Sequence, residues 1–196
     1  CEKSSQLGGR LSLAANMHRE QRAFLNYLRA EVQRLPINIQ LNTHVTPDFV
    51  CGQQPDTVIV ATGAALAPMA YNISSDAKVI QGSALDQHLA DNTPEKITGN
   101  TVAVIGSGLL ALEMAEWLAR AGKTTKLLSS DHRIASEVGR KRRAEECRRL
   151  DAAGVILTTG AHIDSITADG VHITLDGGQR VVKADSVVIA PSFEPD

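Results

Sequence analysis

The stretch that most constrains the fold of this 196-residue chain runs from Thr101 to Gly122, where an apolar run meets a glycine turn and then a helical pattern. Residues 102–105 read Val-Ala-Val-Ile, which is typical of a strand buried on both faces of a parallel sheet. After the turn, apolar residues recur with helical spacing until Gly122, which predicts the end of the helix. These residues are Leu110, Met114, Trp117, Leu118 and Ala121. The stretch therefore predicts a strand, a tight turn and a helix.

The turn has the pattern Gly106-x-Gly108-x-x-Ala111, and each small residue has its own physical task. Gly106 allows the sharp exit from the strand, Gly108 lets backbone N–H groups approach a pyrophosphate, and Ala111 permits close packing of helix on strand. The unpaired N–H groups and positive dipole end of the helix attract phosphate. Glycine turns also occur for purely structural reasons, but the flanking strand and helix favour a dinucleotide site. The predicted cofactor-binding residues are Gly106, Ser107, Gly108, Leu109, Leu110 and Ala111.

A regular pattern continues after this motif. The segment 124–129 is predicted as a second strand, which completes a strand–helix–strand unit. Residues 136–151 predict a highly charged helix, and a solvated face explains its basic cluster better than a polyanion site does. Five further strands are predicted at 155–159, 163–166, 171–175, 181–182 and 185–190, the middle three forming a meander that turns at Asp176-Gly-Gly178.

The first hundred residues show shorter and less regular patterns. Two helices are predicted, an amphipathic one over 19–35, ended by Pro36, and a short one near 83–90. A polar loop is expected over 2–11, a strand over 37–41 with a continuation or a turn at 43–47, and a buried parallel strand over 56–63.

Composition excludes several classes of function. With 20 basic and 22 acidic residues the net charge is −2, so no global electrostatic pull toward nucleic acid or an anionic membrane is expected. No run of about 18 apolar residues predicts a transmembrane helix. The three cysteines are far apart without CxxC spacing, so a metal site is not expected, and free thiols favour a cytoplasmic location. The start at Cys1 lacks both an initiator Met and a signal-peptide pattern, which we interpret as a piece of a longer protein.

An internal repeat supports that interpretation. The apolar segments 56–63 and 185–192 share one pattern at an offset of 129 residues (185 − 56), and Glu2 matches Ser129 at nearly the same offset of 127 (129 − 2). The first copy's glycine turn would then fall before Cys1. We therefore predict an α/β fold with a Rossmann-like parallel sheet, flanking helices and an antiparallel meander, plus an incomplete second nucleotide-binding unit.

Four ordered motifs carry a resemblance to a known family. They are Glu2-Lys-x-x-x-Leu-Gly-Gly9, Thr57-Val-Ile-Val-Ala-Thr-Gly63, Gly106-x-Gly108-x-x-Ala111-x-Glu113 and Ala184-Asp-Ser-Val-Val-Ile-Ala190. Together they resemble the flavoprotein reductases with two dinucleotide-binding domains, and most of all the C-terminal part of NADH:flavin oxidoreductases similar to 2,4-dienoyl-CoA reductase and trimethylamine dehydrogenase. The resemblance implies a partial FAD-type domain with a connector over 1–98 and an NAD(P)-binding Rossmann-like domain over 99–196.

The resemblance also implies roles for residues of the first part. Glu2 would take the ribose hydroxyls of the FAD adenosine, Gly8 and Gly9 would pass close to the flavin nucleotide, and Thr62 and Gly63 would line the exit from the FAD domain. In intact relatives hydride passes from NAD(P)H to FAD, and electrons then reach FMN through a 4Fe–4S cluster. The FMN and the cluster would lie outside this chain. The expected partners are a nucleotide cofactor and the remainder of the parent flavoenzyme, and the chain alone is expected to be inactive.

Ser129 stands where an NAD site commonly has an acidic residue that binds the ribose 2′-hydroxyl. With Ser129 as a hydrogen-bond donor and Arg133 as a charge partner, a 2′-phosphate would fit, which favours NADPH over NADH. Asp131 turning inward would favour NADH instead. Pro191 and Ser192 narrow the backbone options near the nicotinamide position, which keeps an ADP- or AMP-binding module without hydride transfer as an alternative. A scaffold that binds no nucleotide is the third hypothesis.

Overall fold

The computed structural model describes residues 1–195, which divide into two compact units. The first comprises Cys1–Ala64 together with Pro195, and the second comprises Ala65–Glu194. The predicted boundary between residues 98 and 99 divides the chain by expected cofactor site, whereas these two units are divided by compactness. The predicted boundary therefore stays a prediction. No helix within residues 1–195 is long and apolar enough to cross a membrane.

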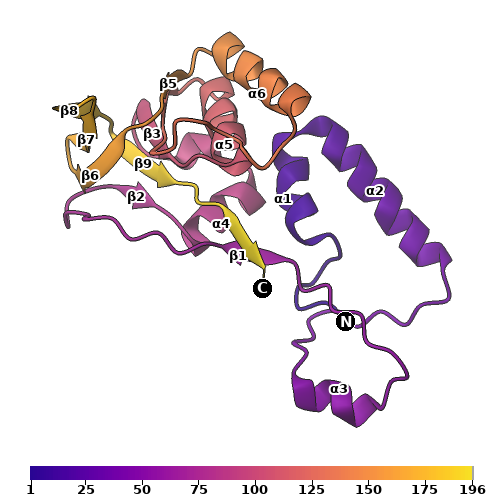
Figure 1. Ribbon diagram of the computed structural model, residues 1–196. Coiled ribbons are helices and arrows are strands. Elements are labelled where there is room, and N and C mark those ends of the chain that lie inside the picture. The colour runs from indigo at the N-terminus through magenta and orange to yellow at the C-terminus, as the bar shows by residue number, and fades with distance from the viewer. Residues whose placement is uncertain (196) are drawn as a thin grey trace. The chain divides into compact units, whose positions relative to one another are not determined.

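The first unit contains three helices, α1 (Gly9–Met17), α2 (Arg19–Arg34) and α3 (Pro47–Gln53), drawn in indigo and purple in Figure 1. The α2 helix agrees with the predicted helix over 19–35. The prediction of a loop up to residue 11 was wrong, because α1 already begins at Gly9. Gly8 precedes α1 with φ of +128°, and a Cβ there would come within 2.6 Å of Leu25 in α2. A glycine at this position therefore allows α1 and α2 to pack closely.

Two predicted strands of the first unit are absent within residues 1–195. Residues 37–41 lie in extended chain outside any strand, although Glu2 donates a backbone hydrogen bond to the carbonyl of Gln40 at 2.8 Å. Of the two alternatives at 43–47, the strand continuation is not formed, because Thr46 caps α3 and Pro47 is its first residue. The Thr46 hydroxyl accepts a hydrogen bond from the amide of Phe49 at 3.2 Å. Local capping chemistry therefore decided this segment.

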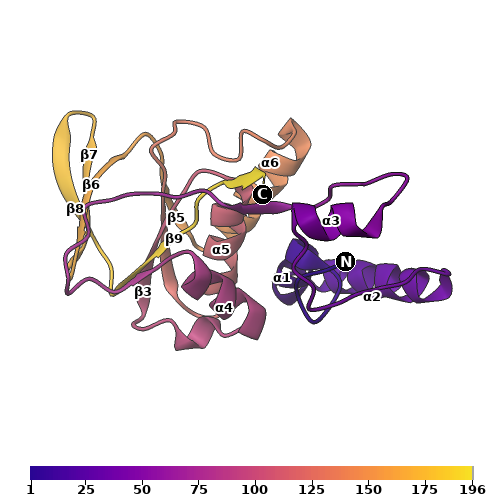
Figure 2. The same ribbon diagram turned by 90° about the horizontal axis from the view of Figure 1, so that it is seen from below.

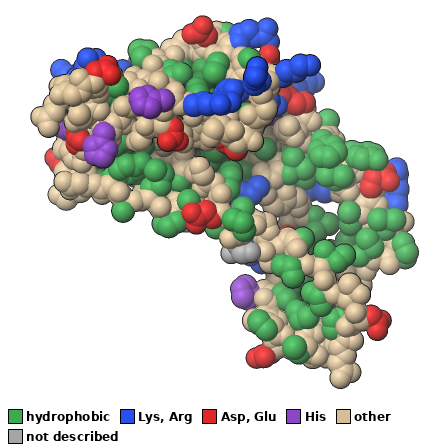
Figure 3. Space-filling model, in the orientation of Figure 1, with side chains coloured by type: hydrophobic (Ala, Val, Ile, Leu, Met, Phe, Trp, Pro, Cys, Tyr) green, Lys and Arg blue, Asp and Glu red, His purple; other side chains and the backbone are tan. Residues whose placement is uncertain are grey.

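The prediction of a buried strand over 56–63 was also wrong. These residues lie outside any helix or strand, and the side chains of Val58, Ile59 and Val60 are 52%, 87% and 79% exposed. A parallel strand is stable only when neighbouring strands take up its backbone hydrogen bonds, and no strand of residues 1–195 pairs with this segment. The apolar run is therefore part of a broad display of exposed apolar side chains on the first unit (Figure 3).

A five-stranded parallel sheet forms the centre of the second unit. Its strands, in spatial order, are β2 (Val79–Ile80), β9 (Ser186–Ile189), β3 (Thr101–Ile105), β4 (Thr124–Leu128) and β5 (Ile156–Thr158). All neighbouring pairs are parallel. A separate two-stranded sheet joins β1 (Ala64–Leu66) to β10 (Phe193–Pro195). The strands predicted over 102–105, 124–129, 155–159 and 185–190 are confirmed to within one or two residues.

The second unit has three layers (Figure 2). One face of the parallel sheet carries helices, and the other carries the antiparallel meander β6 (His162–Thr167), β7 (Gly170–Leu175) and β8 (Gly178–Lys183). Between the sheet and the meander lies a core of fully buried side chains, among them Ala103, Ile105, Ile166 and Ile173. The alternation of side chains along β3 sends Ala103 and Ile105 to this face.

Four helical segments belong to this unit: α4 (Ser83–Asp91), the 3₁₀ turn η1 (Pro94–Lys96), α5 (Leu109–Arg120) and α6 (Arg140–Ala152). The predicted helix near 83–90 is confirmed as α4. The charged helix predicted over 136–151 begins later, at Arg140, because residues 130–139 form a loop that ends at the helix cap Gly139. Lys and Arg side chains gather over α6, as a solvated face requires (Figure 3). The predicted α/β fold class is thereby confirmed.

Candidate nucleotide-binding site

The predicted glycine turn lies at the carboxyl ends of β3 and β9, where the strand order reverses. From β3 the chain passes to β4 and β5 on one side, and it returns to β9 on the other side. The two strands stay joined up to their ends, since the amide of Ala190 donates to the carbonyl of Ile105 at 2.9 Å. In open α/β sheets, ligands bind in the crevice outside such a switch point. Topology therefore places the turn where a ligand is expected.

Gly106 occupies a position with no room for a side chain. A Cβ there would lie 2.2 Å from the carbonyl oxygen of Ala190 and 2.8 Å from the Cβ of Ala111. The Gly106 amide also donates to the carbonyl of Leu128 at 3.0 Å, which ties the turn to β4. The turn is thus held by both neighbouring strands, and the close helix packing predicted for Ala111 is present, with Ala111 fully buried.

Gly108 caps the N-terminus of α5 in an extended conformation, and no side-chain hydrogen bond caps the helix at this residue. A Cβ at Gly108 would lie 3.0 Å from Oε1 of Glu137 and 3.5 Å from Oγ of Ser192. The atoms nearest to this position are therefore side-chain atoms from two other loops. Backbone of this kind, at a helix N-terminus, fits the close approach of a pyrophosphate. Ser107, Leu109 and Leu110 complete the predicted set around it.

Glu137 is a site residue that the sequence reasoning missed. It lies in the loop between β4 and α6, and its Oε1 accepts a hydrogen bond from the amide of Leu109 at 2.5 Å. The amide is the first in α5, so the carboxylate is at the positive end of the helix dipole. No spacing rule identifies such a residue, because the contact depends on the path of a loop 28 residues further along the chain.

Ser129 follows β4 directly and is fully buried. Its hydroxyl donates to the carbonyl of Asp131 at 3.0 Å and accepts from the amide of Asp131 at 3.1 Å. The hydroxyl predicted to donate to a 2′-phosphate thus closes a local turn instead. Arg133, two residues after Asp131, is exposed in the same loop. The two predicted residues lie at the carboxyl end of β4, but only Arg133 presents its side chain at the surface.

Ion pairs hold α5, the helix of the site, against α6. Glu146 in α6 is 1% exposed, and its Oε1 lies 2.7 Å from Nε of Arg142. Nη2 of the same arginine lies 3.3 Å from Oε1 of Glu113 in α5. Burial raises the pKa of Glu146 above its ordinary value, and the charges of Arg142 and Arg149 oppose that shift. The two helices are therefore connected through a half-exposed arginine that pairs with a buried carboxylate of its own helix.

The remaining predicted residues belong to the first unit. The carboxylate of Glu2 accepts from the amide and the hydroxyl of Ser4 at 2.8 and 2.7 Å, and these hydrogen bonds hold the pKa of Glu2 below its ordinary value. Gly8 and Gly9 form the start of α1, and the exposed Thr62 and Gly63 precede β1. Their predicted contacts with FAD stay predictions.

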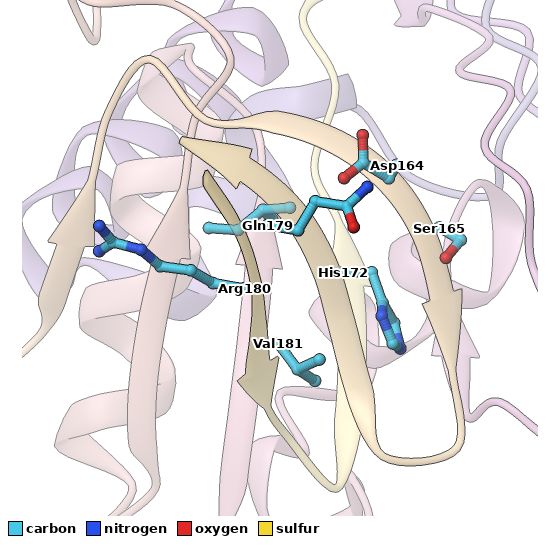
Figure 4. Close-up of a pocket in the computed structure, with 7 residues that line it drawn as sticks. Asp164, Ser165, His172, Gln179, Arg180 and Val181 are labelled. Carbon is cyan, nitrogen blue, oxygen red and sulfur yellow. The ribbon is translucent and has the colours of Figure 1, made fainter. Parts of the chain in front are cut away.

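A shallow depression lies on the outer face of the meander (Figure 4). Its polar lining includes Asp164, His172 and Arg180. The carboxylate of Asp164 accepts from the hydroxyl of Thr174 at 2.9 Å, and His172 lies 3.0 Å from the hydroxyl of Thr167. Asp164 and His172 thus interact with side chains of their own sheet, and no residue of the predicted nucleotide site lines the depression.

A parallel sheet with a glycine turn at its switch point defines the class of dinucleotide-binding folds. The family model of pyridine nucleotide-disulphide oxidoreductases matches residues 40–196. The chain therefore belongs to the pyridine nucleotide-disulphide oxidoreductase family.

Two curated relatives match almost the whole chain. The bilirubin reductase of Mediterraneibacter gnavus (strain CC55_001C) is 30% identical over 200 residues, covering 99% of this chain and 30% of the relative. The NADH oxidase of Thermoanaerobacter brockii is 25% identical over 197 residues, with the same coverage of 99% and 30%. The chain thus spans about 30% of the length of these relatives.

Solved structures share the fold. A 2-naphthoyl-CoA reductase in complex with 2-naphthoyl-CoA superposes with a TM-score of 0.80 at 24% identity, covering 100% of this chain and 29% of that one. A histamine dehydrogenase from Rhizobium sp. 4-9 gives a TM-score of 0.78 at 20% identity, covering 98% and 30%. These likenesses confirm the fold, which this chain shares with about 30% of each of these longer chains.

Proposed function

We propose that the second unit binds NAD(P)H on the Gly106 turn, with the pyrophosphate against the N-terminus of α5. The observation that carries the proposal is the position of this turn at the switch point of the parallel sheet, with Gly106 pressed against Ala190 and Gly108 at the N-terminus of α5. Family membership supports redox chemistry with nicotinamide and flavin in general terms. A bound NAD(P)H would supply the hydride for that chemistry.

The chain would then act as the NAD(P)H-binding part of a larger flavin-dependent oxidoreductase. Its relatives are about three times longer, which supports a partner region elsewhere in the same protein. In that protein FAD would contact Glu2, the Gly8-Gly9 turn and the Thr62-Gly63 segment. FMN and a 4Fe–4S cluster would be bound outside residues 1–196. The final electron acceptor would likewise be selected outside this chain.

NADPH is the proposed preference over NADH. Residue 129 carries no carboxylate to repel a 2′-phosphate, and Arg133 is the exposed cation in the loop that follows β4. Since the Ser129 hydroxyl is engaged with Asp131, Ser129 would shape the loop while Arg133 supplies the charge. The proposal thus depends on Arg133 more than the sequence motif implied.

Calorimetric titration of the chain with NADPH, NADH, ADP and FAD tests these statements. We expect NADPH to bind more tightly than NADH, and Arg133→Ala to reduce that preference by about tenfold, the value of one phosphate contact to a guanidinium. Arg180→Ala, which removes an exposed cation from β8, is the matched control and should change neither affinity. Equal or tighter binding of NADH by the unaltered chain would refute the NADPH preference, and no binding of any nucleotide by the unaltered chain or by any of its variants would refute the proposed site.

The second candidate function is an ADP- or AMP-binding module without hydride transfer. It is favoured by the buried Pro191 and by Ser192, whose hydroxyl borders the space beside Gly108. Proline restricts the backbone where the nicotinamide would lie. The same titration separates the two functions: if ADP binds as tightly as NADH, the nicotinamide half contributes nothing and the module is supported.

A further inference from the structure

The carboxylate of Glu137 lies where the proposed function requires a pyrophosphate. Its Oε1 accepts the Leu109 amide at 2.5 Å, and it lies 3.0 Å from the position of a Cβ on Gly108. These are the two residues whose backbone a dinucleotide phosphate would approach. A negatively charged oxygen on the first amide of α5 is chemically the same kind of occupant as a phosphate oxygen.

The backbone of the loop places Glu137 over the turn. The amide of Ala135 donates to the carbonyl of Ser107 at 2.6 Å, which fastens the loop to the turn itself. Ala135 is fully buried, and its φ of +46° lies in the left-handed region that L-residues other than Asn and Asp seldom adopt. Tertiary contacts therefore hold this loop in place, and the exposed Glu137 side chain is the part that can rotate away.

We propose that Glu137 is an internal competitor of the nucleotide phosphates, which must leave the N-terminus of α5 before a dinucleotide binds. The inference rests on the proposed function, since it assigns a regulating residue to the same site. Two anions cannot share one amide donor, and like charges at contact distance repel each other even where water screens them. The Glu137 carboxylate therefore lowers the affinity of the site and keeps it closed to weakly charged ligands.

A purely structural cap is the other explanation of this contact. Acidic residues at a helix N-terminus stabilise helices without any ligand. The two explanations differ in what a neutral side chain does. Glu137→Gln keeps an acceptor oxygen for the Leu109 amide but removes the charge, so a cap would lose little, whereas a competitor would lose most of its effect on phosphate binding.

The test is calorimetric titration of the 196-residue chain and its variants with NADPH and with ADP. We expect Glu137→Gln to bind both nucleotides about two- to fivefold more tightly than the unaltered chain, the range for one charge at an exposed helix terminus. Glu137→Ala should show the same gain. The control is Glu95→Gln, which changes the net charge equally but lies in η1, before the opposite end of β3. It should leave both affinities unchanged.

The Leu109 amide gives a second readout that does not depend on affinity. In two-dimensional NMR spectra of the unaltered chain its proton should be strongly shifted by the carboxylate, and saturating NADPH should move that resonance. In Glu137→Gln the shift should be reduced before any nucleotide is added. Thermal unfolding of the same variants shows whether each one is folded.

The outcomes separate the inference from the proposed function. Equal nucleotide affinity in the unaltered chain, Glu137→Gln and Glu137→Ala overturns the inference and leaves the nucleotide site standing. Weaker binding in the variants also overturns it, because Glu137 would then assist the ligand. Binding in the variants but not in the unaltered chain supports it most strongly. Absence of binding in every variant overturns the proposed function and the inference together.

Discussion

Replacing Gly106 with alanine tests the steric argument for the turn. The new Cβ would lie 2.2 Å from the carbonyl oxygen of Ala190, 1.2 Å inside the 3.4 Å at which ordinary contacts begin (3.4 − 2.2). Relief requires β9 to move away from β3, since the clashing atom is backbone and not a flexible side chain. Overpacking costs about 1–3 kcal/mol, and weakening the Ala190–Ile105 hydrogen bond adds about 1 kcal/mol. Gly106→Ala should therefore destabilise the second unit by about 2–4 kcal/mol.

Urea denaturation followed by tryptophan fluorescence measures this loss. Trp117 is the single tryptophan of the chain and lies in α5, so its signal reports on the unit that contains the turn. Gly178→Ala is the matched control, because a Cβ there would lie 3.6 Å from the nearest atom, an ordinary contact, and stability should change by less than about 0.5 kcal/mol. A loss below about 1 kcal/mol for Gly106→Ala, or one no larger than the control, would refute the reasoning.

Three further predictions concern the same unit. The Asp185 carboxylate accepts from the amides of Asn100 and Thr101 at 2.8 Å each, which lowers its pKa, so its stabilising effect is present at neutral pH and lost as the pH falls below 3.8. Asp185→Asn should thus be less stable at neutral pH, and its urea midpoint should converge on that of the unaltered chain in acid. The pKa of Glu146 shifts in the opposite direction. It is raised from 4.5, so the folded state gains stability as that carboxylate takes up a proton. The free energy of unfolding of the unaltered chain, relative to that of Glu146→Gln, should therefore increase as the pH falls from neutral to 4.5. A difference between the two proteins that does not change with pH would contradict the raised pKa. Asn92, with φ of +51°, accepts a hydrogen bond from Nε1 of Trp117 at 3.1 Å. Asn92→Gly should cost about 1 kcal/mol and Asn92→Ala about 2 kcal/mol in urea unfolding, because only the alanine adds left-handed strain; equal losses would exclude the strain component.

The site was predictable where its determinants are local in the chain. The order strand, Gly106-x-Gly108 turn and helix follows from residue types within about 20 positions, as does the second strand of the unit. Glu137 was not predictable, because its contact with Leu109 depends on the path of the loop before α6. The engagement of Ser129 was equally hidden, since a serine at a strand end can point to a ligand or close its own turn.

The apolar run at 56–63 has the residue pattern of a strand but does not form one. Its composition is that of a buried strand, as in the closely similar segment 185–192, but only the latter has parallel neighbours on both sides. A strand exists only when another strand takes its hydrogen bonds, and residue types do not reveal whether that neighbour is present. The same applies to residues 37–41, which lie extended without joining a sheet.

The amino-acid sequence alone determined the class of fold, the glycine turn and the order of strands and helices around it, because periodicity and turn chemistry act over a few residues. The tertiary structure alone decided the reversal of strand order beside Gly106, the closeness of Ala190 and the presence of the Glu137 carboxylate on α5. These features join residues that lie between 28 and 84 positions apart (137 − 109 and 190 − 106), and packing rather than local propensity brings such residues together.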